Sequence, residues 1–178
     1  MEEVELRPTH LHWLENNDPF TDCCVHGGVY LRLGERVVSD GTDNNWTIST
    51  AAFNFLRTIF QDHPLKGREA LIPCCGFTML RIDSEPEVLW IPNCDQGINW
   101  SIRHEKDVVV HEFQDGAGIK TSEQAWTNSV CSFADEVRQF FTTAWPKVTP
   151  DEGEREGFEH FMSLWAERRA AADNNGAS

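Results

Sequence analysis

The sequence predicts an α+β fold in which about three helices pack on one antiparallel sheet of about five to six strands. Two observations lead to this prediction. Strand-like segments follow one another through the middle of the chain, and their connections are too short for parallel crossovers. Two later segments repeat apolar residues at helical spacing, so they are expected to cover a face of the sheet.

The first third of the chain is expected to hold a hairpin and a helix. Residues 1–28 carry turn signals and are expected to be irregular. Residues 29–33 and 36–39 alternate in polarity as strands do, and the two residues between them suit a tight turn. A helix is expected from Ser49, which can cap its start, to about His63.

The remainder is expected to hold four strands and two helices. The strands are predicted at residues 77–82, 88–91, 98–103 and 108–113. A long helix from Ser122 to Trp145 is predicted by a continuous apolar stripe. The last helix is expected to be capped by Thr149 and to end at Arg168-Arg169. Residues 1–170 then form a single domain, and residues 171–178, which are small and polar, a disordered tail.

The charge of the chain restricts its partners. Its 178 residues include 29 acidic and 15 basic side chains, which give a formal net charge of −14. Such a field repels phosphate groups, so binding to nucleic acid or to an anionic membrane is not expected. It favours encounter with a protein that has a basic surface. The amino terminus lacks the basic start and apolar stretch of a signal peptide, so a cytoplasmic location with reduced thiols is expected.

Two vicinal cysteine pairs beside glycines are the main candidates for chemistry. They lie in the segments Asp22-Cys23-Cys24-Val25-His26-Gly27-Gly28 and Pro73-Cys74-Cys75-Gly76. Consecutive Cα atoms lie about 3.8 Å apart, which is too close for an ordinary disulfide. Three interpretations remain: a zinc site, a thiolate nucleophile beside His26, or buried thiols that pack as small apolar groups.

The zinc hypothesis has the most specific residue pattern. Cys23 and His26 have the spacing of half a zinc knuckle, and a cysteine of the second pair with Cys94 would complete a Cys3His tetrahedron. The predicted ligands are Cys23, His26, Cys75 and Cys94. No cofactor is expected if the thiols pack as small apolar groups, and zinc is the alternative.

A protein-binding surface is predicted from aromatic and acidic loop residues. An aromatic anchor with a charged rim is typical of such surfaces. The predicted residues are Asp40, Asp43, Trp46, Asp83, Glu85 and Glu87. The function predicted on this basis is non-enzymatic binding of a protein partner that has a basic surface. The alternative is a thiol- or zinc-dependent enzyme, or a zinc-stabilised domain, that uses the cysteines and His26.

The motifs Asp22-x-Cys24-x-His26-Gly27 and Pro73-Cys74-Cys75-Gly76 also carry a resemblance. With their spacing, the chain resembles a family of small uncharacterised bacterial proteins from about residue 12 to residue 168. The resemblance implies a bacterial origin and no particular activity. The chain is more loosely similar to acidic immunity proteins, and that similarity implies neutralisation of a toxin.

Overall fold

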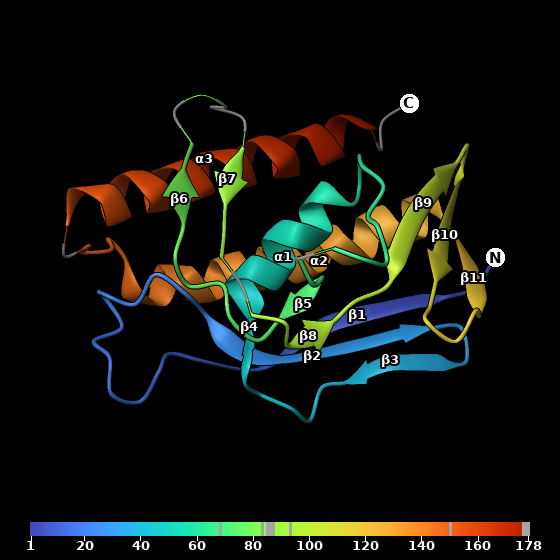
Figure 1. The fold of residues 1–178 in the computed structure, drawn as a ribbon, viewed down its shortest axis with the longest axis horizontal. Helices are drawn as coiled ribbons and strands as arrows, with labels where there is room; N and C mark the ends of the chain where they lie inside the picture. Colours follow the sequence, from blue (N-terminus) through green and yellow to red (C-terminus); the bar gives the residue numbers. More distant parts are fainter. Residues whose placement is uncertain (68, 83, 85–87, 93, 150, 176–178) are drawn as a thin grey trace.

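The predicted α+β class is confirmed (Figure 1). The computed structural model describes residues 1–67, 69–82, 84, 88–92, 94–149 and 151–175, and within them it contains three α-helices and eleven strands. The helices are α1 (Ile48–Arg57), α2 (Glu123–Phe141) and α3 (Glu152–Asn175), and a short 3-10 turn follows α2 at Thr142–Ala144. None of the helices within the described ranges is both long and apolar enough to cross a membrane.

The largest sheet is built from the amino-terminal part of the chain. Strands β1 (Val4–His12), β2 (His26–Leu33) and β3 (Arg36–Asp40) are antiparallel neighbours, and β4 (Trp46–Thr47) also pairs with β2. The predicted β2–β3 hairpin is confirmed. The expectation that residues 1–28 are irregular is wrong for β1, because Val4 and Leu6 turn inward while Glu5 and Arg7 turn outward, the alternation of a strand.

The remaining strands form three further sheets, so the predicted single sheet of five to six strands is corrected. Strands β9 (Ser101–Glu105), β10 (Val108–Glu112) and β11 (Gly118–Ser122) form a meander, in which β11 was not predicted. Two short pairs complete the set, β5 (Ile72–Pro73) with β8 (Gly97–Ile98) and β6 (Leu80–Arg81) with β7 (Leu89–Trp90).

The helix boundaries differ from the prediction where side chains take other partners. Helix α1 begins after Thr47, because the Ser49 hydroxyl is buried and accepts a hydrogen bond from the Val25 amide at 3.3 Å. It ends at Arg57, six residues before His63. In contrast, the predicted start of α2 is confirmed, since the Ser122 hydroxyl accepts from the Ala125 amide and caps the helix. The helix ends at Phe141, four residues before the predicted end at Trp145.

Helix α3 is longer than predicted. The Asp151 carboxylate accepts a hydrogen bond from the Glu154 amide at 2.8 Å and so caps its first turn, a role predicted for Thr149. At the other end the helix continues past Arg169 to Asn175. Ala172 is only 2% exposed there, so the start of the predicted disordered tail is packed helix.

One cluster of buried apolar residues joins these elements. Helix α1 packs against β2, α2 and α3, and α2 also packs directly on β1 of the large sheet (Figure 1). The Phe55 ring of α1 packs against Trp100, Trp126 and Phe133, with ring centroids 5.5–6.1 Å apart. Helix α3 covers α1 and the β6–β7 pair. The segment between α1 and β6 is therefore held on both sides.

Candidate metal centre

Three cysteine thiols meet where β5 pairs with β8. Cys74 and Cys75 directly follow β5, and Cys94 lies shortly before β8. The antiparallel pairing of Pro73 with Gly97 brings the two segments together, and the Cys74 amide donates to the Gln96 carbonyl. As a result, the Sγ atoms of the three cysteines all lie within 4.8 Å of one another.

The close approach of β8 to β5 depends on Gly97. A Cβ atom at this position would lie 2.5 Å from the Cβ of Ala70 and 2.8 Å from the carbonyl oxygen of Ile72. Both separations are shorter than van der Waals contact. A larger residue would push β8 away from β5 and would carry Cys94 away from the other two thiols.

The three thiols are half-buried. The Cys75 thiol donates a hydrogen bond to the sulfur of Cys94, which lowers the pKa of Cys94 and raises that of Cys75 to about 11. The Cys94 sulfur also lies 3.8 Å from the Gln96 carbonyl oxygen. Cys94 is therefore the first of the pair to become a thiolate, the form that binds metals.

The other cysteine pair meets this segment through its backbone. The Cys24 thiol donates to the carbonyl oxygen of Gly76 at 3.7 Å, and the Thr50 hydroxyl donates to the same oxygen at 2.6 Å. Cys24 is buried, and its thiol acts here as a small packing group with one weak hydrogen bond. The two glycine turns thus face each other without bringing their thiols into one cluster.

Of the four predicted ligands, the structure brings only Cys75 and Cys94 together. Cys23 and His26 lie outside the three-thiol group. The third member of the group is Cys74, which the sequence offered as an alternative to Cys75. A backbone turn that presents both members of a vicinal pair to one point has no recognisable spacing signal, so the sequence did not indicate that both would take part.

Burial also weighs against Cys23 and Cys24 as nucleophiles. It raises the pKa of Cys23 to about 11 and raises that of Cys24 further. Both thiols are protonated near neutral pH and are therefore weak nucleophiles. The Cys23 thiol points to the Thr21 carbonyl at 3.9 Å instead of to His26.

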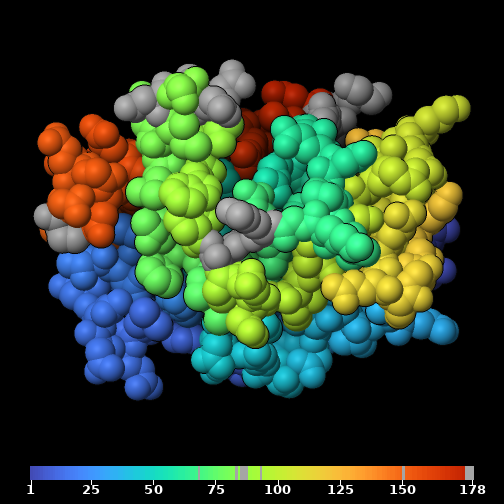
Figure 2. All heavy atoms as spheres, in the orientation of Figure 1, coloured from blue at the N-terminus to red at the C-terminus, as the bar shows by residue number. Residues whose placement is uncertain are grey.

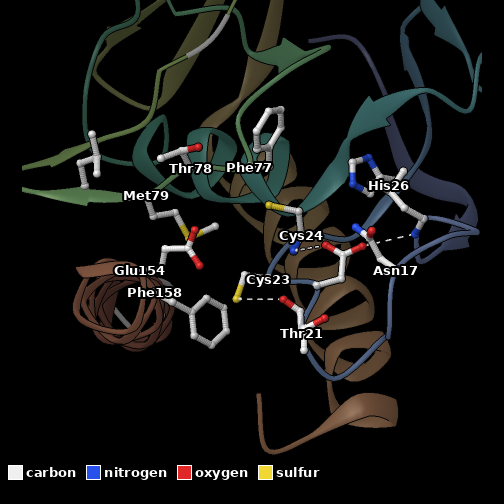
Figure 3. A pocket seen from close by; sticks show the side chains of 13 residues that line it. Asn17, Thr21, Cys23, Cys24, His26, Phe77, Thr78, Met79, Glu154 and Phe158 are labelled. Carbon is white, nitrogen blue, oxygen red and sulfur yellow. Dashed lines mark hydrogen bonds between the residues drawn. The ribbon is translucent and has the colours of Figure 1, made fainter. Parts of the chain in front are cut away.

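A pocket of about 390 Å³ lies beside Cys23 and Cys24 (Figure 3). Its walls come from the loop before β2, from the residues that lead into β6, and from the first turns of α3. Figure 2 shows these three segments meeting at one end of the molecule, in blue, green and orange. In Figure 3, Cys23 and Phe158 lie on one side of Cys24, and His26 and Asn17 lie on the other.

The predicted protein-binding surface is described only in part. Asp40 and Asp43 are exposed, and each carboxylate accepts hydrogen bonds within its own turn, from Thr42 and Asn45 respectively. Trp46 is half-buried and packs against the core. Asp83, Glu85 and Glu87 lie outside the described residues. Partner binding at this surface stays a prediction.

Comparison with known proteins gives no match. No protein-family model, no curated protein and no solved structure is significantly similar to this chain. The resemblance to a bacterial family therefore stays a prediction, and the arguments about function rest on the geometry of the thiol cluster and of the pocket.

Proposed function

We propose that this protein binds one thiophilic metal ion of the zinc class through Cys74, Cys75 and Cys94. The observation that carries the proposal is the separation of the three sulfur atoms, all within 4.8 Å of one another. With a Zn–S distance of about 2.3 Å, the sulfurs of a tetrahedral site lie about 3.8 Å apart. Adjustments of no more than about 1 Å, within the range of side-chain rotation, would close the site.

The type of ligand narrows the choice of ion. Thiolates favour soft or borderline ions such as zinc and copper(I) over magnesium or calcium. The formal charge of −14 favours any cation. A set of three protein ligands leaves a fourth position for water or another molecule, as in exchangeable and catalytic sites and unlike closed structural sites. Reversible binding of the ion is therefore the function that the geometry supports best.

The proposal is tested by zinc titration of the reduced, metal-free protein against a chromophoric chelator. About one equivalent is expected to bind, with release of protons from the thiols. Cys94→Ser is expected to weaken binding by more than about 100-fold, because it removes a ligand and not merely an outer partner. Cadmium in place of zinc should produce thiolate charge-transfer absorption that the same variant reduces.

Two further variants serve as controls. Cys131→Ser changes a half-buried cysteine on α2, outside the cluster, and is expected to keep full affinity. Cys23→Ser separates the observed cluster from the ligand set expected from sequence. Full affinity in Cys23→Ser supports the three-thiol site. Equal affinities for Cys94→Ser and Cys131→Ser, or the absence of a bound ion, would overturn the proposal.

A further inference from the structure

The pocket beside Cys23 contains a buried carboxylate that lacks an ion-pair partner among the described residues. Asp22 is 7% exposed, and its two oxygens accept one hydrogen bond each, from the amides of Leu14 and Cys24 at 3.3 and 3.0 Å. None of the ion pairs between described residues includes it. A carboxylate can accept about four hydrogen bonds, so Asp22, which lines the pocket, retains acceptor capacity. Buried charges in proteins are usually paired, and this one is not.

The nearest cation is already engaged elsewhere. The Lys147 ammonium donates to the Pro19 carbonyl at 2.7 Å and lies 3.5 Å from the centre of the Trp13 ring. Its charge acts on Asp22 over a distance, but it does not line the pocket. The pocket end of Asp22 is thus free for a positive group from outside.

A second buried polar group lines the same pocket without a partner. His26 is 7% exposed, and its Nε2 has no hydrogen-bond partner among the described residues. Burial lowers the pKa of His26, so the ring is neutral at pH 7 and offers one donor and one acceptor. It therefore adds hydrogen-bonding capacity without adding the positive charge that would repel a cation.

The rest of the lining suits the apolar body of a ligand. Phe158 and Met79 form a buried wall, at 4% and 5% exposure, and Phe77 is a strongly exposed wall near the mouth. Aromatic ring faces attract cations as well as apolar groups. Glu154 adds a further negative charge to the lining. A volume of about 390 Å³ is within the range of small-molecule sites, at its lower end.

We propose that this pocket binds a small organic amine, with its ammonium group toward Asp22 and His26 and its apolar body between Phe77 and Phe158. An anion of the same shape is excluded by the charges of Asp22 and Glu154, and an uncharged analogue lacks the attraction. The site is independent of the three-thiol cluster, because none of those cysteines lines the pocket.

The test is calorimetric titration of the whole protein with three probes of similar shape: phenethylamine, phenethyl alcohol and phenylpropionate. The amine is expected to bind at least about tenfold more tightly than the alcohol, because a charge pair a few ångströms apart in a protein site gains more than this factor. The acid should bind more weakly still. Binding of all three with equal affinity, preference for the acid, or no binding of the amine would overturn the proposal.

Variants keep the test independent of folding. Asp22→Asn should remove the preference for the amine, but it also disturbs the loop that Asp22 holds. Phe77→Ala changes a side chain that is 63% exposed, so the fold is expected to tolerate it while amine affinity falls about tenfold. Phe60→Ala, at a 38% exposed phenylalanine outside the pocket, is the matched control and should bind normally. Equal affinities for the two phenylalanine variants would contradict the proposed site.

Discussion

Helix α3 approaches the chain at Met79 so closely that Gly157 has room for no side chain. A Cβ atom at Gly157 would lie 1.8 Å from the Met79 carbonyl oxygen and 2.8 Å from its carbonyl carbon. Ordinary van der Waals contact begins at 3.4 Å. The obstacle is backbone and cannot rotate away, so the helix or the segment before β6 would have to move by more than an ångström.

This contact predicts that Gly157→Ala destabilises the protein, although alanine favours a helix. The gain in helix propensity is about 1 kcal/mol. Overpacking costs about 1–3 kcal/mol, and an immovable carbonyl places this site at the upper end. The net loss in the free energy of unfolding is therefore expected to be about 2 kcal/mol. Urea denaturation followed by tryptophan fluorescence measures this difference.

Gly153→Ala provides the matched control in the same helix. Among the described residues, a Cβ atom at Gly153 would have only the Asp151 carboxylate nearby, at 3.5 Å, which is ordinary contact. This variant should be as stable as the parent protein or more stable by up to about 1 kcal/mol. If Gly157→Ala were as stable as Gly153→Ala, α3 would not pack on Met79 as described. The pocket wall formed by Met79 and by Phe158 of α3 would then be misplaced.

Two further predictions concern stability. Burial lowers the pKa of His111 to about 3. As the pH falls below about 6.5, the unfolded chain binds a proton at this histidine and the native state does not. The free energy of unfolding should therefore fall by about 2 kcal/mol between pH 7 and 5. Urea midpoints at the two pH values measure this, and a slope that persists unchanged in His111→Gln would contradict it. Ala172→Asp should cost at least about 2 kcal/mol by burying a carboxylate, whereas Ala171→Asp, at an exposed position, should change stability by less than about 0.5 kcal/mol. Equal urea midpoints for these two variants would show that the end of α3 is not packed.

The parts of the fold that the sequence predicted are those decided by local pattern. The β2–β3 hairpin follows from alternation and a two-residue turn, and the start of α2 follows from an apolar stripe at helical spacing. The start of α1 did not follow, because Ser49 turns its hydroxyl to Val25 across the core. The end of α3 was missed for a similar reason, since Ala172 is small and unremarkable in sequence but lies against the core in space.

The buried His111 shows the same limit for polar residues. Its strand position was visible in the sequence, but no local pattern indicated that it is fully buried. The Trp100 indole donates to its Nδ1 at 3.1 Å, so Nε2 carries the proton and donates to the Thr121 hydroxyl. Thr121 comes from the neighbouring strand β11, which was not predicted, and Trp100 directly precedes β9. A buried polar network of this kind depends on register, which local pattern does not fix.

The two cysteine pairs look alike in sequence, and long-range pairing separates their roles. Cys24 faces the core beneath Gly76, where burial keeps its thiol protonated and inert. Cys74 and Cys75 stand at the edge of the β5–β8 pair, half-buried, and Cys94 is brought to them by β8. The same motif is thus packing on one side of Gly76 and a candidate metal site on the other. Nothing in either motif specifies which, because the deciding contacts are with residues about 20 to 50 positions away.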